Sequence, residues 1–335
     1  MATMKQVADQ AEVSVATVSR VINKTGYVSP DLEERVQSAM RRLKYQPSAL
    51  ARSLRRQQTQ TRGVLIPQLD QPFFSTLAFA IEKSLFPHEY RTLICSAEED
   101  PEKEHAYTEI MLRQRVDGVI MVPTGLSASN LQLLLEKNVP VVLVDRDLPD
   151  IQVNKVLVSN FKGAYEAMTY LLNLGHRHIG VIGAPEYSQA MQARVAATQQ
   201  ALKDFQIEPN PELLVMGSLQ QFDMGYQSAQ KLLQQHPRPT AIFALMDVIA
   251  IGVMHAVAEA GLRIPQDLSI MGFDDIPLAA YSVPTLTSVA QPIAQMGEIA
   301  IRLLLKHIQQ RDLPTETIML NTRLQVRQST GAPSL

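Results

Sequence analysis

The chain lacks tryptophan, and Cys95 is its single cysteine among 335 residues. One cysteine cannot form an internal disulfide, which excludes the disulfide-rich folds of many small secreted proteins. No run of apolar residues approaches the roughly 18 that a membrane span requires, so a membrane protein is excluded as well. Residues 1–6 contain no apolar signal region, and we therefore expect a cytoplasmic protein.

Common enzyme motifs are also missing. The chain has no Gly-x-Gly-x-x-Gly opening, no Walker loop and no Gly-x-Ser-x-Gly elbow. His176 and His178 flank Arg177 and are interpreted as charges near a helix C-terminus rather than as metal ligands. We therefore expect no enzymatic activity, no cofactor and no metal site.

The net charge of −2 conceals an uneven distribution of charge. Residues 1–62 contain eleven Lys and Arg against five Asp and Glu, whereas the other 273 residues are acidic overall. Between Arg41 and Arg62 there are seven basic residues and no acidic one. This density favours a polyanionic partner such as DNA, although a solvated helix face with a basic linker would have the same composition.

Three short helices are predicted at the start of the chain. Thr3 begins a capping box, which predicts a helix over residues 4–11. Ser14 is an N-cap candidate for a second helix over 15–23. Ser29 is expected to cap a third helix, whose first residue is a proline. These helices would form a minimal three-helix domain.

Only three residues separate the first two predicted helices, which is the spacing of a helix-turn-helix. The apolar residues of the second helix form an inward stripe. The residues that face outward or forward are Val15, Ala16, Thr17 and Arg20. Helical hairpins with this spacing also occur in enzymes, so the spacing alone leaves DNA binding and a purely structural role open.

A short amphipathic segment follows the three helices. Residues 45–56 are too few for a stable isolated helix, yet Ala49, Leu50, Ser53 and Leu54 fall on one helical face. Such a helix needs a partner against which to fold. The polar residues 57–61 then predict a linker.

Motifs along the whole chain share the order and composition of one protein family. They are Val7-Ala8, Thr17-Val-Ser-Arg-Val-Ile-Asn23, Tyr45-Gln-Pro-Ser-Ala-Leu-Ala-Arg-Ser-Leu54, Asp70-Gln-Pro-Phe-Phe74, Arg115-Val-Asp-Gly-Val-Ile120, Val144-Asp-Arg146, Leu174-Gly-His-Arg-His-Ile-Gly180, Gly272-Phe-Asp-Asp-Ile276 and Pro284-Thr-Leu-Thr-Ser-Val-Ala-Gln-Pro292. Together they resemble the LacI/GalR family of bacterial transcription regulators. The segment 45–54 is similar to the hinge of purine-responsive members, and the start of the second helix is similar to that of galactose-responsive members.

One residue departs from the family pattern. Glu12 stands in the turn where the family usually has glycine. Glycine tolerates a left-handed backbone at lower cost, so we expect some strain in this turn and an intact motif.

The resemblance implies three kinds of DNA contact. The N-termini of the first two helices would hold phosphates, and the second helix would read bases in the major groove, with Arg20 on guanine or, alternatively, on phosphate. The hinge helices of a dimer would meet in the minor groove, where Leu54 of each wedges into a central CG step, unless it is an ordinary core residue. The implied DNA-binding residues are Thr3, Ser14, Val15, Ala16, Thr17, Arg20, Asn23, Ser48, Ala51, Leu54 and Arg55.

From Gly63 onward, short β-rich runs alternate with amphipathic stretches. This rhythm predicts an α/β fold of doubly wound parallel sheets, with helices on both faces. The strands are too numerous for one sheet of typical size, so we expect two lobes divided near Ser159. The strand candidates are 64–67, 92–95, 118–122, 141–144, 179–182, 241–244 and 268–272.

The resemblance implies a body like that of periplasmic binding proteins, in which the chain crosses three times between lobes. The expected domains are a helix-turn-helix head over 1–46 and a hinge helix with linker over 47–61. The N-terminal effector-binding lobe would comprise 62–160 and 292–322. The C-terminal lobe would comprise 161–291 and 323–335.

A resemblance to ribose-binding periplasmic proteins implies a sugar site in the cleft between these lobes. Such a site needs aromatic faces and charged planar groups at the carboxyl ends of strands. Met246 stands where these proteins commonly have asparagine, so a deoxy, bulkier or partly apolar sugar is as plausible as ribose. The candidate residues are Phe73, Phe74, Asp145, Arg146, Ser159, Arg194, Phe222, Met246, Asp274 and Gln291. For Arg146, Arg194 and Asp274, structural ion pairing is the alternative.

A single small head contacts one half-site, so we expect a homodimer on palindromic double-stranded operator DNA. Residues 328–335 contain no leucine heptads, which favours dimers over tetramers. The sequence therefore predicts a repressor of a sugar or related catabolic operon, controlled by a small effector such as a pentose. A solute-binding protein without DNA function and a doubly wound enzyme are the alternatives.

Overall fold

The computed structural model divides into two units, a head up to Gln60 and a body from Thr61 to the C-terminus. No helix of the segments that the structure describes is long and apolar enough to cross a membrane. The described residues are 2–23, 25–45, 59–88, 90–125, 127–148, 150–184, 189–217 and 222–334.

The head contains the three predicted helices, α1 (Met4–Ala11), α2 (Val15–Asn23) and α3 (Pro30–Arg42). The capping box of α1 is confirmed, since the Gln6 backbone N–H donates to Thr3 Oγ1 and the Gln6 side chain accepts from the Thr3 N–H. Ser14 caps α2, because its Oγ accepts from the Thr17 N–H at 3.0 Å. The head core consists of the fully buried Val7, Val18 and Val36 with smaller residues around them.

Two details of the head concern its turns. Glu12 has the predicted left-handed backbone, with φ 53°, and Arg35 Nη2 donates to the adjacent Ala11 carbonyl at 2.7 Å. Ser29 occupies the N-cap position of α3, but its hydroxyl makes no cap hydrogen bond, so the predicted cap is wrong in this respect. Pro30 and the acidic residues of the first turn favour the helix start instead.

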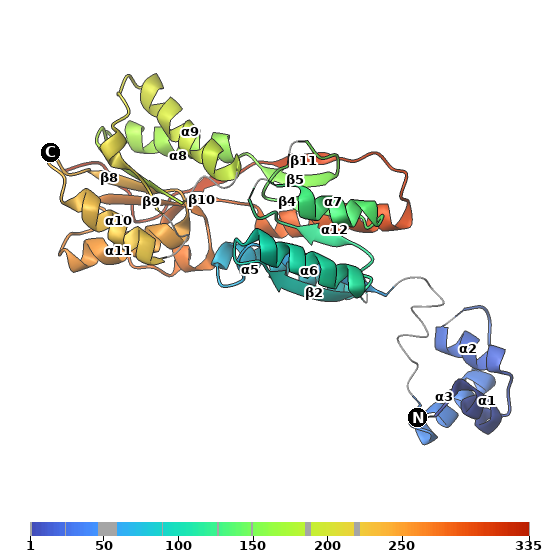
Figure 1. Cartoon of the computed structure of the whole chain (residues 1–335). Coiled ribbons are helices and arrows are strands. Elements are labelled where there is room, and N and C mark those ends of the chain that lie inside the picture. Colours follow the sequence, from blue (N-terminus) through green and yellow to red (C-terminus); the bar gives the residue numbers. More distant parts are fainter. Residues whose placement is uncertain are drawn as a thin grey trace. The chain divides into compact units, whose positions relative to one another are not determined.

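The first lobe of the body is built on a parallel six-stranded sheet of order β11-β5-β4-β3-β1-β2 (Figure 1). Along β1, Val64 and Ile66 face one core and Leu65 faces the other, because successive side chains point to opposite faces. Helices α5 and α12 pack together on one face, while α6 and α7 cover the other. The strands are β1 (Thr61–Ile66), β2 (Arg91–Ser96), β3 (Val119–Met121), β4 (Val141–Val144), β5 (Asn154–Val158) and β11 (Thr317–Leu320), and the helices are α5 (Pro72–Leu85), η1 (Phe86–His88), α6 (Pro101–Arg113), α7 (Ser129–Glu136) and α12 (Ile293–Gln309).

The second lobe has a six-stranded sheet of order β12-β10-β9-β8-β6-β7, in which only the described pair β10 and β12 is antiparallel. Helices α10 and α11 approach closely, because a Cβ on Gly252 would lie 2.0 Å from the Phe222 carbonyl oxygen. The strands are β6 (Ile179–Gly183), β7 (Leu214–Met216), β8 (Ala241–Ala244), β9 (Ser269–Asp274), β10 (Thr287–Ala290) and β12 (Arg323–Gln325), and the helices are α8 (Asn160–Asn173), α9 (Gln189–Asp204), η2 (Pro211–Leu213), α10 (Phe222–Leu233), α11 (Asp247–Glu259) and η3 (Pro277–Ala280).

The chain crosses between the two sheets three times. It leaves the first sheet after β5, returns after β10 to form α12 and β11, and crosses again to β12. All three crossings lie at one boundary between the lobes (Figure 1). This topology brings the carboxyl ends of strands from both sheets toward each other, which is where doubly wound folds bind ligands.

His176 is not the helix-terminal charge that the sequence predicted. It is buried, with Nε2 2.9 Å from the Gly331 carbonyl oxygen and Nδ1 2.9 Å from Thr240 Oγ1, and desolvation lowers its pKa. Arg177 does lie at the end of α8, where it donates to the Leu172 carbonyl. Cys95 is buried, as an ordinary apolar residue would be.

Candidate functional site

The outer surface of α2 carries the side chains that the sequence predicted for DNA reading. Val15, Ala16 and Arg20 are exposed, whereas Val18 is fully buried against α1 and α3. A short helix with this division buries one face in its own core and leaves the other face open to solvent or to a binding partner. The arrangement fits a recognition helix.

Polar residues at the helix ends are tied to the backbone. Ser14 Oγ and Thr17 Oγ1 lie 2.9 Å apart, and Asn23 Nδ2 donates to the Ser19 carbonyl at 2.7 Å. Thr3 is held by its capping box at the N-terminus of α1. The predicted hinge contacts lie outside the described residues, namely Ser48, Ala51, Leu54 and Arg55.

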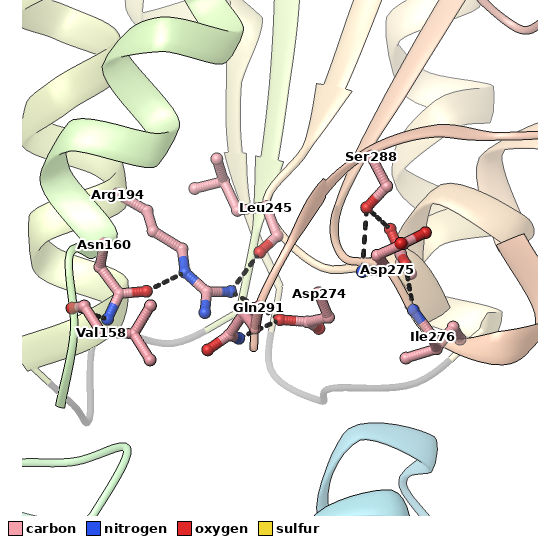
Figure 2. A network of polar contacts seen from close by, with 10 residues as sticks. Val158, Asn160, Arg194, Leu245, Asp274, Asp275, Ile276, Ser288 and Gln291 are labelled. Carbon is pink, nitrogen blue, oxygen red and sulfur yellow. Dashed lines mark hydrogen bonds and ion pairs between the residues drawn. The ribbon is translucent and has the colours of Figure 1, made fainter. Parts of the chain in front are cut away.

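In the body, Arg194 of α9 is the centre of a buried polar network between the lobes (Figure 2). Its Nε donates to Asn160 Oδ1 at 2.8 Å, and its Nη1 donates to the Leu245 carbonyl at 2.7 Å and to Asp274 at 3.4 Å. Its guanidinium carbon also lies 3.7 Å from the centre of the Phe273 ring. These contacts hold the guanidinium at the carboxyl ends of β5, β8 and β9.

Asp274 and Gln291 complete the second-lobe side of this network. Gln291 Nε2 donates to Asp274 Oδ1 at 2.7 Å, while Gln291 Oε1 is buried and has no hydrogen-bond partner. Burial raises the pKa of Asp274 to about 6, against the lowering effect of Arg194. Its backbone has φ 118°, a strained conformation of the kind that occurs at functional sites.

Asp145 faces this network from the end of β4 in the first lobe. Only 7% of it is exposed, and Oδ1 has no hydrogen-bond partner. Burial raises its pKa, and the charges of Arg194 and Arg146 oppose that rise. A buried acceptor without a donor is costly, so this oxygen is suited to a hydroxyl group of a ligand.

Arg146 does not extend freely into the cleft. It donates twice to the Glu99 carboxylate, at 2.8 and 2.6 Å, and once to the Pro123 carbonyl at 3.1 Å. Its guanidinium carbon lies 5.5 Å from the centre of the Phe74 ring. This bidentate pair neutralises the charge of Arg146 within the first lobe. The structure therefore favours structural ion pairing, the alternative to effector binding, for this residue.

A second layer of contacts holds the backbone that follows Asp274, at Asp275 and Ile276 (Figure 2). Asp247, at the start of α11, accepts from the Ile276 N–H at 2.8 Å and from Ser288 Oγ at 2.6 Å. Burial and the nearby Asp274 charge raise the pKa of Asp247 well above its usual value. A Cβ on Gly272 would lie 2.1 Å from Asp247 Oδ1, so this layer needs glycine there.

The remaining predicted effector residues are less closely grouped. Phe73 and Phe74 are buried near the start of α5, with ring centres 5.2 Å apart. Met246 is buried at the N-cap of α11 and belongs to the apolar core. Phe222 is exposed and lines a pocket of about 270 Å³ together with Gln68, Asp70, Gln71, Pro72, Asp223 and Val248.

A larger pocket of about 470 Å³ lies beside the network, and Asp145 and Ser159 line it together with Asn160. Another pocket, of about 190 Å³, lies at the amino ends of β6 and β7 and contains none of the predicted site residues. Among the described residues, no three His, Cys, Asp or Glu side chains form a possible metal site.

Sequence reasoning missed several residues of the network. Asn160 and Glu99 hold Arg194 and Arg146, and Asp247 holds the turn after Asp274. Asn160 and Asp247 are the first residues of α8 and α11, and each follows the carboxyl end of a strand. This position is typical of ligand sites in doubly wound folds and could have identified both as candidate site residues. Nothing in the sequence around Glu99 marked it, because its partner is 47 residues away.

Two family models match the chain. Residues 3–48 match the bacterial regulatory proteins of the lacI family, and residues 168–330 match a periplasmic binding protein-like domain. The first match covers the three helices of the head, and the second covers most of the second lobe with α12.

The chain is similar to curated repressors over nearly its whole length. It is 37% identical to the HTH-type transcriptional repressor PurR of Klebsiella pneumoniae (strain 342) over 331 residues, which are 98% of this chain and 97% of that protein.

Solved structures of LacI family regulators resemble the fold. A lac repressor dimer bound to operator and the anti-inducer ONPF has a TM-score of 0.88 and 27% identity, covering 99% of both chains. A LacI family regulator from Enterococcus faecium with bound ribose has a TM-score of 0.75 and 32% identity, covering 82% of this chain and all of that one. These relatives are regulators and not enzymes, and this chain belongs to the LacI family of bacterial transcriptional repressors.

Proposed function

We propose that the head binds operator DNA and that its affinity is controlled by an uncharged polyhydroxylated effector, such as a pentose or related sugar, held in the cleft around Arg194. The observation that carries the proposal is the pair of buried acceptors without donors, Asp145 Oδ1 and Gln291 Oε1. They come from different lobes and lie at the carboxyl ends of β4 and β10. A ligand that satisfies both would join the lobes.

The charges of the cleft favour a neutral ligand over a phosphorylated one. Arg146 is paired with Glu99, and Arg194 already donates to three acceptors. Asp145 and Asp274 add buried carboxyl groups that would repel an anion. The similar regulator from Enterococcus faecium, whose structure contains ribose, supports a sugar.

For DNA, we propose a homodimer that reads a palindrome through α2 of each head. The exposed side chains of α2 support this reading, as does the similarity to the operator-bound lac repressor dimer. The proposed domains are the head (1–46), the hinge and linker (47–61), the first lobe (62–160 with 292–322) and the second lobe (161–291 with 323–335). Sheet membership supports these boundaries, since β11 joins the first sheet and β12 the second.

A ligand screen tests the proposal. Pentoses, hexoses, their phosphates, nucleosides and purines are added to the full chain, and the thermal unfolding midpoint is measured. An effector at 100 times its Kd stabilises a protein by about 2.7 kcal/mol, which a thermal shift resolves. Operator binding is then measured at fixed salt with each stabilising compound.

We expect a neutral sugar to raise the unfolding midpoint and to change operator affinity. Stabilisation by phosphates or purines alone would contradict the sugar assignment and leave the repressor assignment intact. Salt-independent DNA binding would contradict operator recognition itself, because phosphate contacts release counterions.

A further inference from the structure

The pocket of about 190 Å³ in the second lobe lies away from the Arg194 network, and we call it the β6–β7 pocket. It is formed by the start of β6, the last two turns of α9 and the segment that joins α9 to β7. The network lies at the carboxyl ends of β8 and β9, which run parallel to β6. The two sites therefore occupy opposite ends of the second sheet.

The wall of the β6–β7 pocket is mostly apolar. Ile179 and Val181 of β6 form one side, Leu202 of α9 forms another, and Ile207 and Leu213 come from the joining segment. An apolar cavity of about 150 Å³ holds benzene, and the β6–β7 pocket is slightly larger. Its volume therefore fits one six-membered ring with a small substituent.

Backbone hydrogen bonds fix the segment that closes this pocket. The Ile207 N–H donates to the Leu202 carbonyl at 2.9 Å, which holds the turn after α9. The Leu213 N–H donates to the Asn210 carbonyl at 3.0 Å, and Asn210 Oδ1 accepts from the Glu212 N–H at 3.0 Å. A ligand thus enters a pre-formed site, which lowers the entropy lost on binding.

One buried polar atom of the lining has no partner. Arg177 Nη1 donates to the Leu172 carbonyl at 2.8 Å, and Thr198 Oγ1 donates to the Val195 carbonyl at 2.7 Å. His178 Nε2, in contrast, is buried and makes no hydrogen bond. A buried polar atom without a partner is costly, and a hydroxyl group could satisfy this nitrogen in either tautomer, because a hydroxyl both donates and accepts.

The charges at the β6–β7 pocket favour a neutral ligand. Arg177 and Glu208 both line it, and both are exposed. Their opposite charges offset each other, so an anionic ligand would meet Glu208 and a cationic one would meet Arg177.

We propose that the β6–β7 pocket is a second small-molecule site, which binds a neutral compound with one aromatic ring and a single hydroxyl group, of the size of phenol. The ring packs on Leu202 and Ile207, and the hydroxyl group meets His178 Nε2. A rigid ring buries apolar area and loses little conformational entropy on binding. The inference goes beyond the sugar effector, because the described residues that line this pocket include none of the Arg194 network.

Methyl NMR of the full-length protein tests the site, with phenol as the probe and benzene as the matched ligand without a hydroxyl group. We expect phenol to shift the methyl signals of Ile179 and Ile207 until they saturate. The signal of Ile120, in the core of the first lobe, should not move. Phenol should bind about tenfold more tightly than benzene, the gain expected from one hydrogen bond to a buried partner.

Substitutions of His178 test the polar contact. His178→Phe should bring the affinities for phenol and benzene within about twofold of each other, whereas His178→Gln retains a hydrogen-bonding group and should keep an advantage of about threefold or more. His88→Phe is the matched control, because His88 is exposed on η1 in the first lobe. Gln291→Ala removes a residue of the Arg194 network and should leave phenol affinity within about twofold.

Three results would overturn the proposal. They are an absence of shifts at Ile179 and Ile207, equal affinities for phenol and benzene in the wild type, and an unchanged advantage of phenol in His178→Phe. The sugar-binding function would stand in each case, because sugars are measured separately at the other end of the sheet. Phenol binding without any sugar binding would overturn only the sugar effector.

Discussion

Arg194 is the residue whose loss should separate effector binding from DNA binding. Its removal leaves Asp274, Asn160 and the Leu245 carbonyl each with one donor fewer. We expect Arg194→Ala to lower effector affinity by about 100-fold or more, since each lost contact in a buried site costs about 1–3 kcal/mol. Operator binding without effector should persist, as measured by anisotropy of labelled DNA.

The control for this prediction is Arg263→Ala. Arg263 also pairs with an aspartate, Asp267, but its side chain is 72% exposed, whereas that of Arg194 is 5% exposed. Circular dichroism at the assay temperature verifies that both variants are folded. Unchanged effector affinity in Arg194→Ala would place the ligand elsewhere.

Asp274 should make stability depend on pH in a defined direction. Its pKa rises from 3.8 to about 6 on folding, so between these values the folded protein retains a proton that the unfolded chain has lost. The stabilisation of the folded state by the protonated Asp274 carboxyl is therefore fully present below pH 4 and is lost as pH rises through about 6. We expect the unfolding free energy of the wild type, relative to Asp274→Asn, to fall by on the order of 3 kcal/mol across this window.

Denaturant titrations at a series of pH values measure this difference. The charged groups that face Asp274 are Arg194, Asp145 and Asp247. None of them is changed in the Asp274→Asn variant. Asp267→Asn is a useful comparison, because Arg263 lowers the pKa of Asp267 to about 2 and predicts the opposite slope. A wild-type-to-variant difference that does not change between pH 4 and pH 6 would refute the assignment.

At the scale of elements, the turn between α1 and α2 stores strain. Glu12 is left-handed, and its carboxylate gains only a long, exposed contact of 3.4 Å with Arg35. We expect Glu12→Gly to stabilise the head by about 1 kcal/mol, because glycine adopts this conformation freely. Hydrogen exchange of the Val13 and Val18 amides in the full chain measures the effect.

Gly26 provides the reciprocal control. It is also left-handed, with φ 76°, and a Cβ there would meet no atom within 4 Å. Gly26→Ala should therefore destabilise the head through backbone strain alone, by about 1–2 kcal/mol. Equal exchange rates in Glu12→Gly and the wild type would show that the Arg35 contact offsets the strain.

At the scale of the whole molecule, the proposed homodimer should select a palindrome of roughly 14–18 base pairs with a central CG, because paired heads flank a wedge in the minor groove. Selection from random DNA with the purified protein measures the consensus.

The variant Leu54→Ala should weaken operator binding by a few kcal/mol and leave effector binding intact. An asymmetric consensus, or equal loss of both activities, would contradict the model of a paired hinge.

Much of the architecture follows from local patterns in the sequence. The caps at Thr3 and Ser14, the alternation of strands and helices, and the motif order predicted the head and the doubly wound sheets, because these signals act over a few residues. Strands such as β5 and β11 were not predicted. β5 begins with Asn154 and Lys155, and β11 is a mostly exposed edge strand, so neither reads as an apolar run.

The sequence by itself predicted Arg194, Asp274 and Gln291 as site residues, and two of them, Asp274 and Gln291, lie in the family motifs 272–276 and 284–292. Only the tertiary structure decided how they are paired. Arg146 forms an ion pair with Glu99, whereas Asp145 Oδ1 and Gln291 Oε1 are buried acceptors without a hydrogen-bond donor. These pairings join residues tens of positions apart on different strands and lobes, and no local pattern specifies which buried charge meets which partner.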